Sequence, residues 1–302
     1  MISLSDVLQI LVISFSAMVP ISLAAIGEII GEKAGVINIG LEGILITSAL
    51  MAAFAAESVG SPVVGLAAGV GVGLLLGMLH GLVSVYWKGD HIISGVGINL
   101  LGAGLISFGL IAIWGVPGQH VVPDAARMGD IPTPYGGISY LTILTVLLAI
   151  GAYMLLNRTK LGVRIGIVGE HPRAADVAGV NVEATRFWAT TTGAALAGLG
   201  GAFMSLDWFG VLVNELAAGR GFIALATVVF SKLNPLLALV GGLIFGFFDS
   251  LAVWVQSSSA IKEAVPWQII STLPYVVTLL VVAGAIGRAR FPSKLGEAYR
   301  RE

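Results

Sequence analysis

The sequence contains no cysteine and very little charge. Only 11% of its 302 residues are charged, whereas a soluble domain carries about a quarter charged residues. The chain therefore lacks the polar surface that a water-facing globule needs. The absence of cysteine excludes disulfides, thiolate metal sites and cysteine nucleophiles. The four histidines show no spacing typical of a metal site; they are His80, His91, His120 and His171.

Several functional classes have no residues to support them. Residues 166–169 are not followed by Lys-Ser or Lys-Thr, so the chain has no phosphate-binding loop of the nucleotide-hydrolase type. No nucleophile–base pair indicates an intramembrane enzyme, and no basic patch indicates nucleic-acid binding. We therefore expect no catalytic residue, metal or cofactor on this chain. The first apolar stretch lacks a basic region before it, so no cleavable signal peptide is expected.

Apolar runs, by contrast, recur from end to end. Hydrophobic residues make up 57% of the sequence, and a run of about 20 apolar residues can cross a bilayer core of roughly 30 Å. The pattern predicts an all-α fold, a polytopic transmembrane bundle of about nine spans (eight to ten) that forms a single domain over residues 1–302. The regular spans are predicted at residues 6–27, 38–57, 62–87, 92–114, 138–156, 187–209, 235–254 and 266–287.

Two segments depart from this regular pattern. In residues 210–231 the apolar part is too short to cross alone, and Asn214, Glu215 and Arg220 interrupt what precedes it. We interpret this segment as a broken or re-entrant helix, which is tolerated only inside protein or beside a cavity. Residues 115–137 contain four prolines and several glycines, and we expect them to form an irregular, packed cap.

The distribution of cations predicts the orientation in the membrane. With the N-terminus outside and nine spans, 13 of the 16 basic residues lie inside, and only Arg127, Arg220 and Lys262 lie outside. Cytoplasmic loops carry an excess of Lys and Arg, so residues 157–186 and the tail 288–302 are predicted to be cytoplasmic. We expect the basic tail to be a solvated anchor.

Glycines and acidic residues stand inside the apolar spans. Close helix packing explains most of these glycines, with a gating hinge as the alternative; they include Gly69, Gly71, Gly73, Gly77, Gly193, Gly198, Gly200 and Gly201. The acids are Glu28, Glu42, Asp207 and Asp249. An acid in a first helical turn is favoured by the helix dipole, so a structural role for Glu42 is preferred over substrate contact. None of the acids has a partner at helical spacing.

The cytoplasmic segment 157–186 is the most specific feature, because it holds eight charged residues within thirty positions. Pro172 suits the first position of a helix, Gly179 suits its C-terminal cap, and Asn181 can cap the helix that follows. Ala174, Ala175 and Ala178 would form a small-residue face. The pattern predicts a two-turn helix parallel to the membrane. It either docks into a groove of another protein or is an ordinary interfacial loop.

Four spaced motifs carry a family resemblance. They are GEIIGEKAGVINIGLEG at 27–43, SGVGIN at 94–99, GVRIGIVGEHPRAADVAGVN at 162–181, and GRGFIALA at 219–226 with Asn234, Pro235 and Gly246. Together they resemble the bacterial ABC-importer permeases for nucleosides and simple sugars, closest to the shorter nucleoside-type permease. The resemblance covers about residues 24–250. Gly166 and His171 depart from it, where alanine and asparagine are more usual.

The resemblance implies a multi-pass permease of the bacterial cytoplasmic membrane, in contact with lipid, that does not itself hydrolyse ATP. It implies four partners: a second related permease, a cytoplasmic ATPase with two nucleotide sites that holds ATP and Mg, an extracytoplasmic substrate-binding lipoprotein, and a small-molecule substrate. Nucleosides come first as substrates, with a simple sugar such as ribose or galactose as the alternative. An ion-driven secondary transporter is a further alternative, which would need acidic residues facing a cavity.

Two sets of site residues follow from the resemblance and the span pattern. The residues expected to couple to the ATPase are Glu170, His171, Pro172, Arg173, Ala174, Ala175, Asp176 and Gly179. Candidates for the translocation path are Glu42, Phe54, Asn99, Phe108, Arg220 and Asp249. Ordinary helix packing is the competing explanation for Phe54, Asn99 and Phe108, as it is for Trp114.

Overall fold

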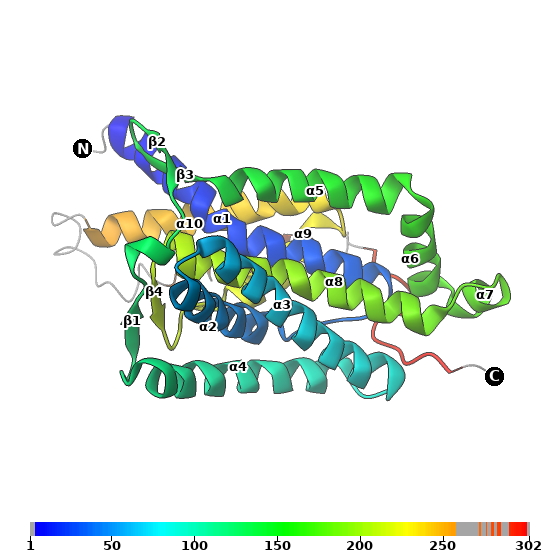
Figure 1. Cartoon of the computed structure of the whole chain (residues 1–302). Helices are drawn as coiled ribbons and strands as arrows, with labels where there is room; N and C mark the ends of the chain where they lie inside the picture. The colour runs from blue at the N-terminus through cyan, green and yellow to red at the C-terminus, as the bar shows by residue number, and fades with distance from the viewer. Residues whose placement is uncertain are drawn as a thin grey trace.

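A computed structural model shows a bundle of long helices that run side by side (Figure 1). It describes residues 4–257, 272, 276, 279–280, 283–284 and 290–300. The N-terminus and the short strands lie at one end of the bundle, whereas α6, α7 and the C-terminus lie at the other (Figure 1). The two termini are therefore at opposite ends of the bundle.

Six helices in the described part are long and apolar enough to cross a membrane. They confirm the corresponding predicted spans, whereas the predicted span 266–287 lies almost wholly outside the described residues. The helices are α1 (Leu4–Lys33), α2 (Leu41–Val59), α3 (Pro62–Gly81, continued by the π-helical turn Leu82–Tyr86), α4 (His91–Trp114), α5 (Tyr140–Arg158) and α10 (Pro235–Ser257).

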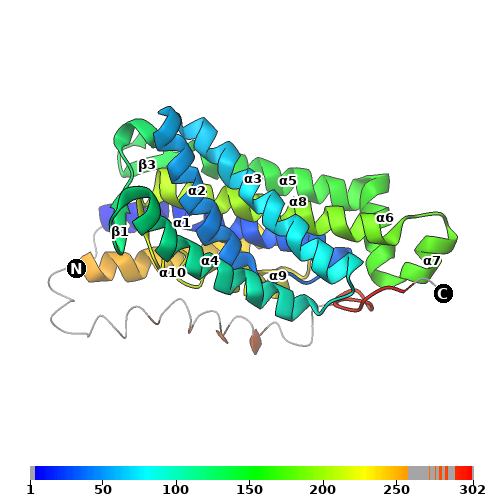
Figure 2. The ribbon, with the colours of Figure 1, turned by 60° about the horizontal axis from the view of Figure 1, so that its bottom comes forward.

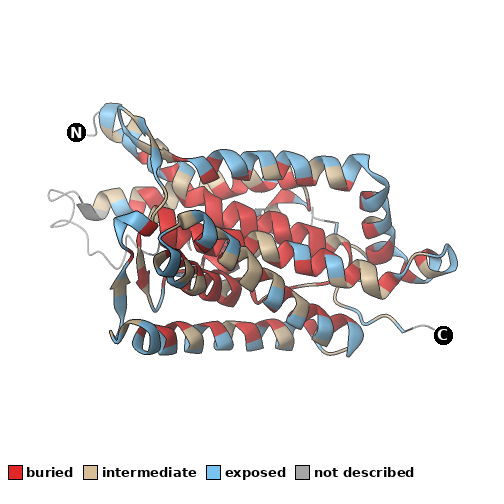
Figure 3. Ribbon diagram, viewed as in Figure 1, coloured by how far each residue is buried: buried red, intermediate tan, exposed pale blue. Residues whose placement is uncertain are grey.

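Helix α8 (Val182–Phe203) forms the centre of the bundle and continues through a π-helical turn at Met204–Trp208. It packs against α1, α2 and α3, and much of it is buried (Figure 3). Glycines make this packing possible: a Cβ on Gly193 would lie 2.3 Å from the carbonyl oxygen of Gly27, and one on Gly73 would lie 2.4 Å from that of Ala194. The close-packing interpretation is confirmed for these positions, whereas Gly71 has open space around it.

Two helices begin inside the bundle rather than at its ends. Residues 34–40 turn back from the end of α1 into the bundle, and α2 begins there at Leu41. In the segment 210–231, the strand β4 (Val211–Val213) and a turn precede α9 (Arg220–Ser231). Twelve helical residues span about 18 Å, less than a bilayer core. The segment is therefore interrupted, as predicted.

The cap at the N-terminal end contains short strands, which corrects the strictly all-α prediction. Strand β1 (Gln119–Val121) pairs with β4, and β2 (Asp130–Thr133) pairs with β3 (Gly136–Ser139), both antiparallel. The short 3₁₀ helix Asp124–Ala126 lies between them in sequence. Prolines and glycines in residues 115–137 indicated an irregular segment, but β1 has its partner some 90 residues further along the chain, which no local pattern reveals.

At the opposite end, α5 is followed by α6 (Lys160–Glu170) and α7 (Pro172–Val177). Helix α6 runs across the direction of the long helices (Figure 1). Residues 290–300 of the tail return to the same end and lie near α7 (Figure 2). This end therefore carries three segments outside the long helices, and the cations of 157–186 are gathered there.

Candidate functional site

Helix α7 is built as its sequence predicts. Pro172 occupies the first turn, Gly179 adopts a left-handed φ of 83° beyond the last turn, and the Asn181 side chain accepts a hydrogen bond from the Ala184 N–H at 2.9 Å. Glu183 stands in the first turn of α8 and forms an ion pair with Lys88. These caps hold α7 as a short projection between α6 and α8.

The predicted alanine face is wrong in one respect. Ala175 is fully buried and packs with Val168 and Val182, with Tyr299 against the same cluster. The exposed residues of α7 are Arg173, Ala174 and Val177, followed by Ala178 at its C-terminal cap, and Val177 is 91% exposed. A partner that docks on α7 would therefore meet Ala174 and Val177, whereas Ala175 fixes the helix to its own chain.

The described part of the C-terminal tail is largely exposed, as the sequence predicted, and it is also hydrogen-bonded to the bundle. The Ser293 N–H donates to the Glu170 carboxylate at 3.0 Å, and the Tyr299 hydroxyl donates to the Asp176 carboxylate at 2.9 Å. The Gly296 N–H donates at 3.0 Å to the carbonyl of Gly35, in the corner between α1 and α2. The tail thus joins the ends of α6 and α7 to the start of the segment that leads into α2.

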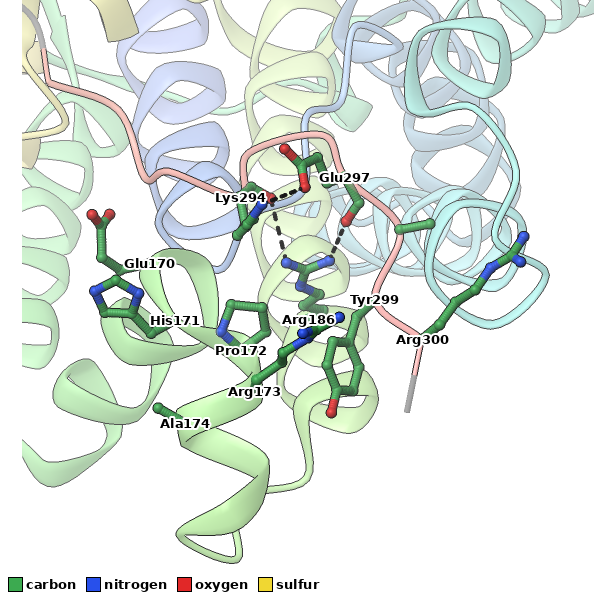
Figure 4. Close-up of a pocket in the computed structure, with 11 residues that line it drawn as sticks. Glu170, His171, Pro172, Arg173, Ala174, Arg186, Lys294, Glu297, Tyr299 and Arg300 are labelled. Carbon is green, nitrogen blue, oxygen red and sulfur yellow. Dashed lines mark hydrogen bonds and ion pairs between the residues drawn. The ribbon is translucent and has the colours of Figure 1, made fainter. Parts of the chain in front are cut away.

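A cavity of about 660 Å³ lies between α7 and the tail (Figure 4). Arg186 of α8 points into this region, where its guanidinium donates to the backbone carbonyls of Glu297 at 2.6 Å and Lys294 at 3.4 Å. The cavity contains five of the eight residues expected to couple to an ATPase. Its lining residues are Glu170, His171, Pro172, Arg173, Ala174, Arg186, Lys294, Glu297, Ala298, Tyr299 and Arg300.

A second polar cluster lies deep in the bundle, where α9 begins beside the first turn of α2. The Glu42 carboxylate accepts hydrogen bonds from the N–H groups of Gly219 and Gly221, each at 2.7 Å. A carboxylate at a helix N-terminus satisfies unpaired N–H groups and complements the helix dipole. Gly221 is required by this contact, because a Cβ there would lie 2.4 Å from the Glu42 nitrogen. The preferred structural role of Glu42 is thus supported by its contacts.

Arg220 and Asp249 form an ion pair at 2.6 Å, so the prediction that the acids in the spans lack partners is wrong for Asp249. The Arg220 guanidinium also lies over the rings of Trp208 and Phe209, at 4.7 and 5.3 Å from their centroids. Arg220 is buried, only 8% exposed. The ion pair joins α9 to α10 through two residues 29 positions apart, and this separation hides the partnership in the sequence.

Comparison with known proteins identifies the fold family. Residues 10–282 match the family described as the permease component of the branched-chain amino acid transport system. The chain belongs to this permease family. No solved structure matches it.

Three relatives match nearly the whole length of the permease. It is 34% identical to the guanosine ABC transporter permease protein NupQ of Bacillus subtilis, over 97% of this chain and 98% of that protein. It is 33% identical to the nucleoside ABC transporter permease protein NupC of Lactococcus lactis, over 93% of both chains. It is also 34% identical to a putative glucose ABC transporter permease protein, TsgC13 of Haloferax volcanii, over 93% of this chain and 94% of that protein.

The remaining path candidates of the permease divide into two groups. Asn99 has a structural role, because its amide donates to the carbonyl of Ile39 and accepts from the N–H of Gly43, which fixes α4 to the start of α2. Phe54 and Phe108 are 40% and 69% exposed, on the packed pair α2 and α4. They therefore face away from the core of this subunit.

Sequence reasoning missed several interacting residues. Glu57 accepts hydrogen bonds from Trp114 at 2.7 Å and bonds His120 at 2.8 Å, which ties α2 to the cap. Trp208 and Phe209 stack on each other at 4.2 Å. Glu57 is 57 positions from Trp114 and 63 from His120, so no local sequence pattern reveals these contacts.

Proposed function

We propose that this chain is the permease subunit of an ATP-driven, binding-protein-dependent ABC importer whose substrates are nucleosides. The observation that supports this most strongly is the identity of 33–34% to two permeases named for guanosine and nucleosides, over at least 93% of the chain.

A simple sugar is the second candidate substrate. The putative glucose permease is as similar as the nucleoside permeases, at 34% identity, and a galactofuranose transporter permease of Escherichia coli is 27% identical over 74% of the chain. In an importer of this kind the receptor chooses the substrate, so the permease sequence discriminates between the two classes only weakly.

The proposed energy source is a cytoplasmic ATPase with two nucleotide sites, which binds ATP and Mg and docks at the α6–α7 end. Three features support this placement: α7 projects beyond the bundle, Val177 on it is 91% exposed, and the cations of 157–186 surround it, as the positive-inside rule requires for a cytoplasmic segment. In this orientation the N-terminus is outside and the tail is inside. A substrate-binding lipoprotein would then meet the cap formed by β1–β4.

The proposed translocation path runs along the exposed side of α2 and α4, towards a second, related permease. Phe54 and Phe108 would line it, because aromatic rings suit a nucleobase. Four polar residues would act behind this surface by holding the N-terminal ends of α2 and α9, which lie inside the bundle. They are Glu42, Asn99, Arg220 and Asp249. Helices that begin inside the membrane are a common feature of transporters. Here Asn99 binds the N-terminus of α2, and Glu42 binds the N-terminus of α9.

Substrate class is tested with the receptor and the complete importer together. Calorimetry on the purified receptor should show binding of guanosine or another nucleoside and none of glucose, ribose or galactose. Uptake of labelled guanosine into proteoliposomes that contain receptor, both permeases and ATPase should be competed by unlabelled nucleosides only. Binding of sugars alone by the receptor, with sugar uptake, would replace the nucleoside assignment with the sugar one.

A further inference from the structure

A groove of about 570 Å³ lies between α5, α6 and α8, at the end of the bundle that carries α7. Its lining on α8 forms one stripe, because the residues recur at each turn of the helix. The stripe covers 15 residues, or about 22 Å of helix, which is more than half the thickness of a bilayer core. The groove is therefore deep enough to follow one leaflet of the membrane. The α8 stripe consists of Asn181, Thr185, Trp188, Thr192 and Leu196.

The walls of this groove are largely apolar. Leu155 of α5 and Leu161 of α6 line it opposite the α8 stripe. The hydroxyls of the stripe are already bonded to their own helix, since Thr185 donates to the carbonyl of Asn181 at 2.7 Å and Thr192 to that of Trp188 at 2.8 Å. These walls suit a hydrocarbon chain, whereas a polar ligand would find few partners on them.

The α6 end of the groove is cationic. Arg164 lines the groove and is exposed, and the exposed Arg158 and Lys160 precede it by six and four residues. Residues 157–169 contain no acidic residue, and none of the described residues that line the groove is acidic. The group that complements this end of the groove is therefore an anion.

Helix α6 has the features of a helix that lies in a membrane surface. It runs across the direction of the long helices (Figure 1) and exposes Leu161, Val163 and Ile167 beside its cations. Exposed apolar side chains next to Lys and Arg are typical of helices that bind anionic lipid. Trp188, in the wall of the groove, is also exposed, and tryptophan is enriched where a membrane meets water.

We propose that the groove binds one anionic phospholipid of the cytoplasmic leaflet, with its phosphate on Arg164 and an acyl chain along the α8 stripe. The orientation proposed above puts the α6 end in that leaflet, whose anionic lipids attract basic segments. A guanidinium binds a phosphate through two parallel hydrogen bonds. A lipid in the groove would fill the space between α5, α6 and α8, and would hold α6, which leads directly into α7.

The test measures phospholipid retention by the full permease chain, purified in detergent, with native mass spectrometry. Phosphatidylglycerol and phosphatidylcholine with the same acyl chains are added in equal amounts. The unmodified chain should retain one phosphatidylglycerol with a preference of about fivefold or more, and Arg164→Gln should reduce the preference to within about twofold. Lys232→Gln is the matched control and should keep the preference, since Lys232 is exposed but does not line the groove.

A larger side chain tests the apolar part of the groove. Thr192 is exposed on the α8 stripe, so Thr192→Phe should fold normally and narrow the groove. Retention of phosphatidylglycerol should then fall about fivefold or more, because the acyl chain loses its contacts. Ile143→Phe is the matched control, since Ile143 is exposed on α5 outside the groove. The melting temperatures of both variants check that they are folded.

Three results would overturn the inference. The first is equal retention of the two lipids by the unmodified chain, or an unchanged preference in Arg164→Gln. The second is competition by glycerophosphoglycerol, the headgroup without chains, that is as strong as competition by the lipid. The third is loss of the lipid from the complete importer when the ATPase binds, which would assign the groove to contact with the ATPase. The tests of substrate and energy source are independent of all three.

Discussion

At the scale of single residues, glycine and paired charge determine how this bundle packs. Gly27 and Gly193 allow the backbones of α1 and α8 to touch, since a Cβ on either would lie 2.1–2.3 Å from a carbonyl oxygen of the other helix. Glycine is otherwise a poor helix former, so its presence in mid-helix indicates close approach. In α6, Gly162 and Gly169 likewise allow close approach, because a Cβ on either would meet a backbone carbonyl.

We expect Gly193→Ala to destabilise the protein by about 1–3 kcal/mol, the usual cost of overpacking. Gly71→Ala is the matched control, because a Cβ there meets no atom within 4 Å and alanine favours a helix by about 1 kcal/mol. The melting temperatures of the two variants in detergent provide the measurement. Equal stability of both variants would show that α1 and α8 do not pack as closely as described.

The ion pair between Arg220 and Asp249 gives a second prediction at this scale. Asp249→Leu leaves the Arg220 side chain charged at 9% exposure, and loss of one partner of a buried pair costs more than loss of both. We expect the double variant Arg220→Met, Asp249→Leu to be more stable than Asp249→Leu alone, by about 2 kcal/mol. A double-mutant cycle in thermal unfolding measures this difference. Additive effects of the two changes would contradict the pair.

At the scale of elements, hydropathy and capping residues predicted where helices lie. Contacts between distant residues determined the position of the tail and the burial of Ala175. Hydropathy located the six long helices, and Pro172, Gly179 and Asn181 predicted the limits of α7 because caps act within a few residues. The tail could not be placed, since its contacts with Gly35, Glu170 and Asp176 join residues more than 120 positions apart. Burial of Ala175 had no local signal either, because Tyr299 and Val182 cover it.

Helix α7 therefore has a docking face and an anchoring face, which two substitutions distinguish. Ala174→Asp with Val177→Asp places charge on the exposed face, and we expect loss of ATPase stimulation with an unchanged melting temperature. Ala175→Asp buries a carboxylate among apolar side chains, which costs several kcal/mol, so we expect it to loosen α7 itself. ATPase assays and hydrogen exchange over residues 170–180 measure the two effects. Normal stimulation by the exposed-face variant would contradict docking on α7.

At the scale of the whole molecule, the two clusters lie at different depths and are joined by the same chain segment. The α7 end of the bundle contacts Gly35 through the tail. The backbone then runs from residue 35 through Asn38, whose N–H donates to Glu28 at 2.7 Å, to Glu42 in the first turn of α2, which binds the start of α9. Motion at α7 therefore has a short route to the inner ends of α2 and α9. The family match over residues 10–282 covers α7 and residues 35–42 but not the tail. Sequence alone predicted functional residues at both ends of this route without the contacts that join them.

The most direct test of the account is the energy source of uptake. Proteoliposomes that contain the permease pair, the ATPase and the receptor are loaded with ATP and Mg on the ATPase side, and labelled guanosine is measured inside, without any ion gradient. We predict uptake that requires hydrolysable ATP and is lost with Ala174→Asp plus Val177→Asp. Uptake that persists without ATP under a sodium or proton gradient, and that is unaffected by these substitutions, would contradict the account.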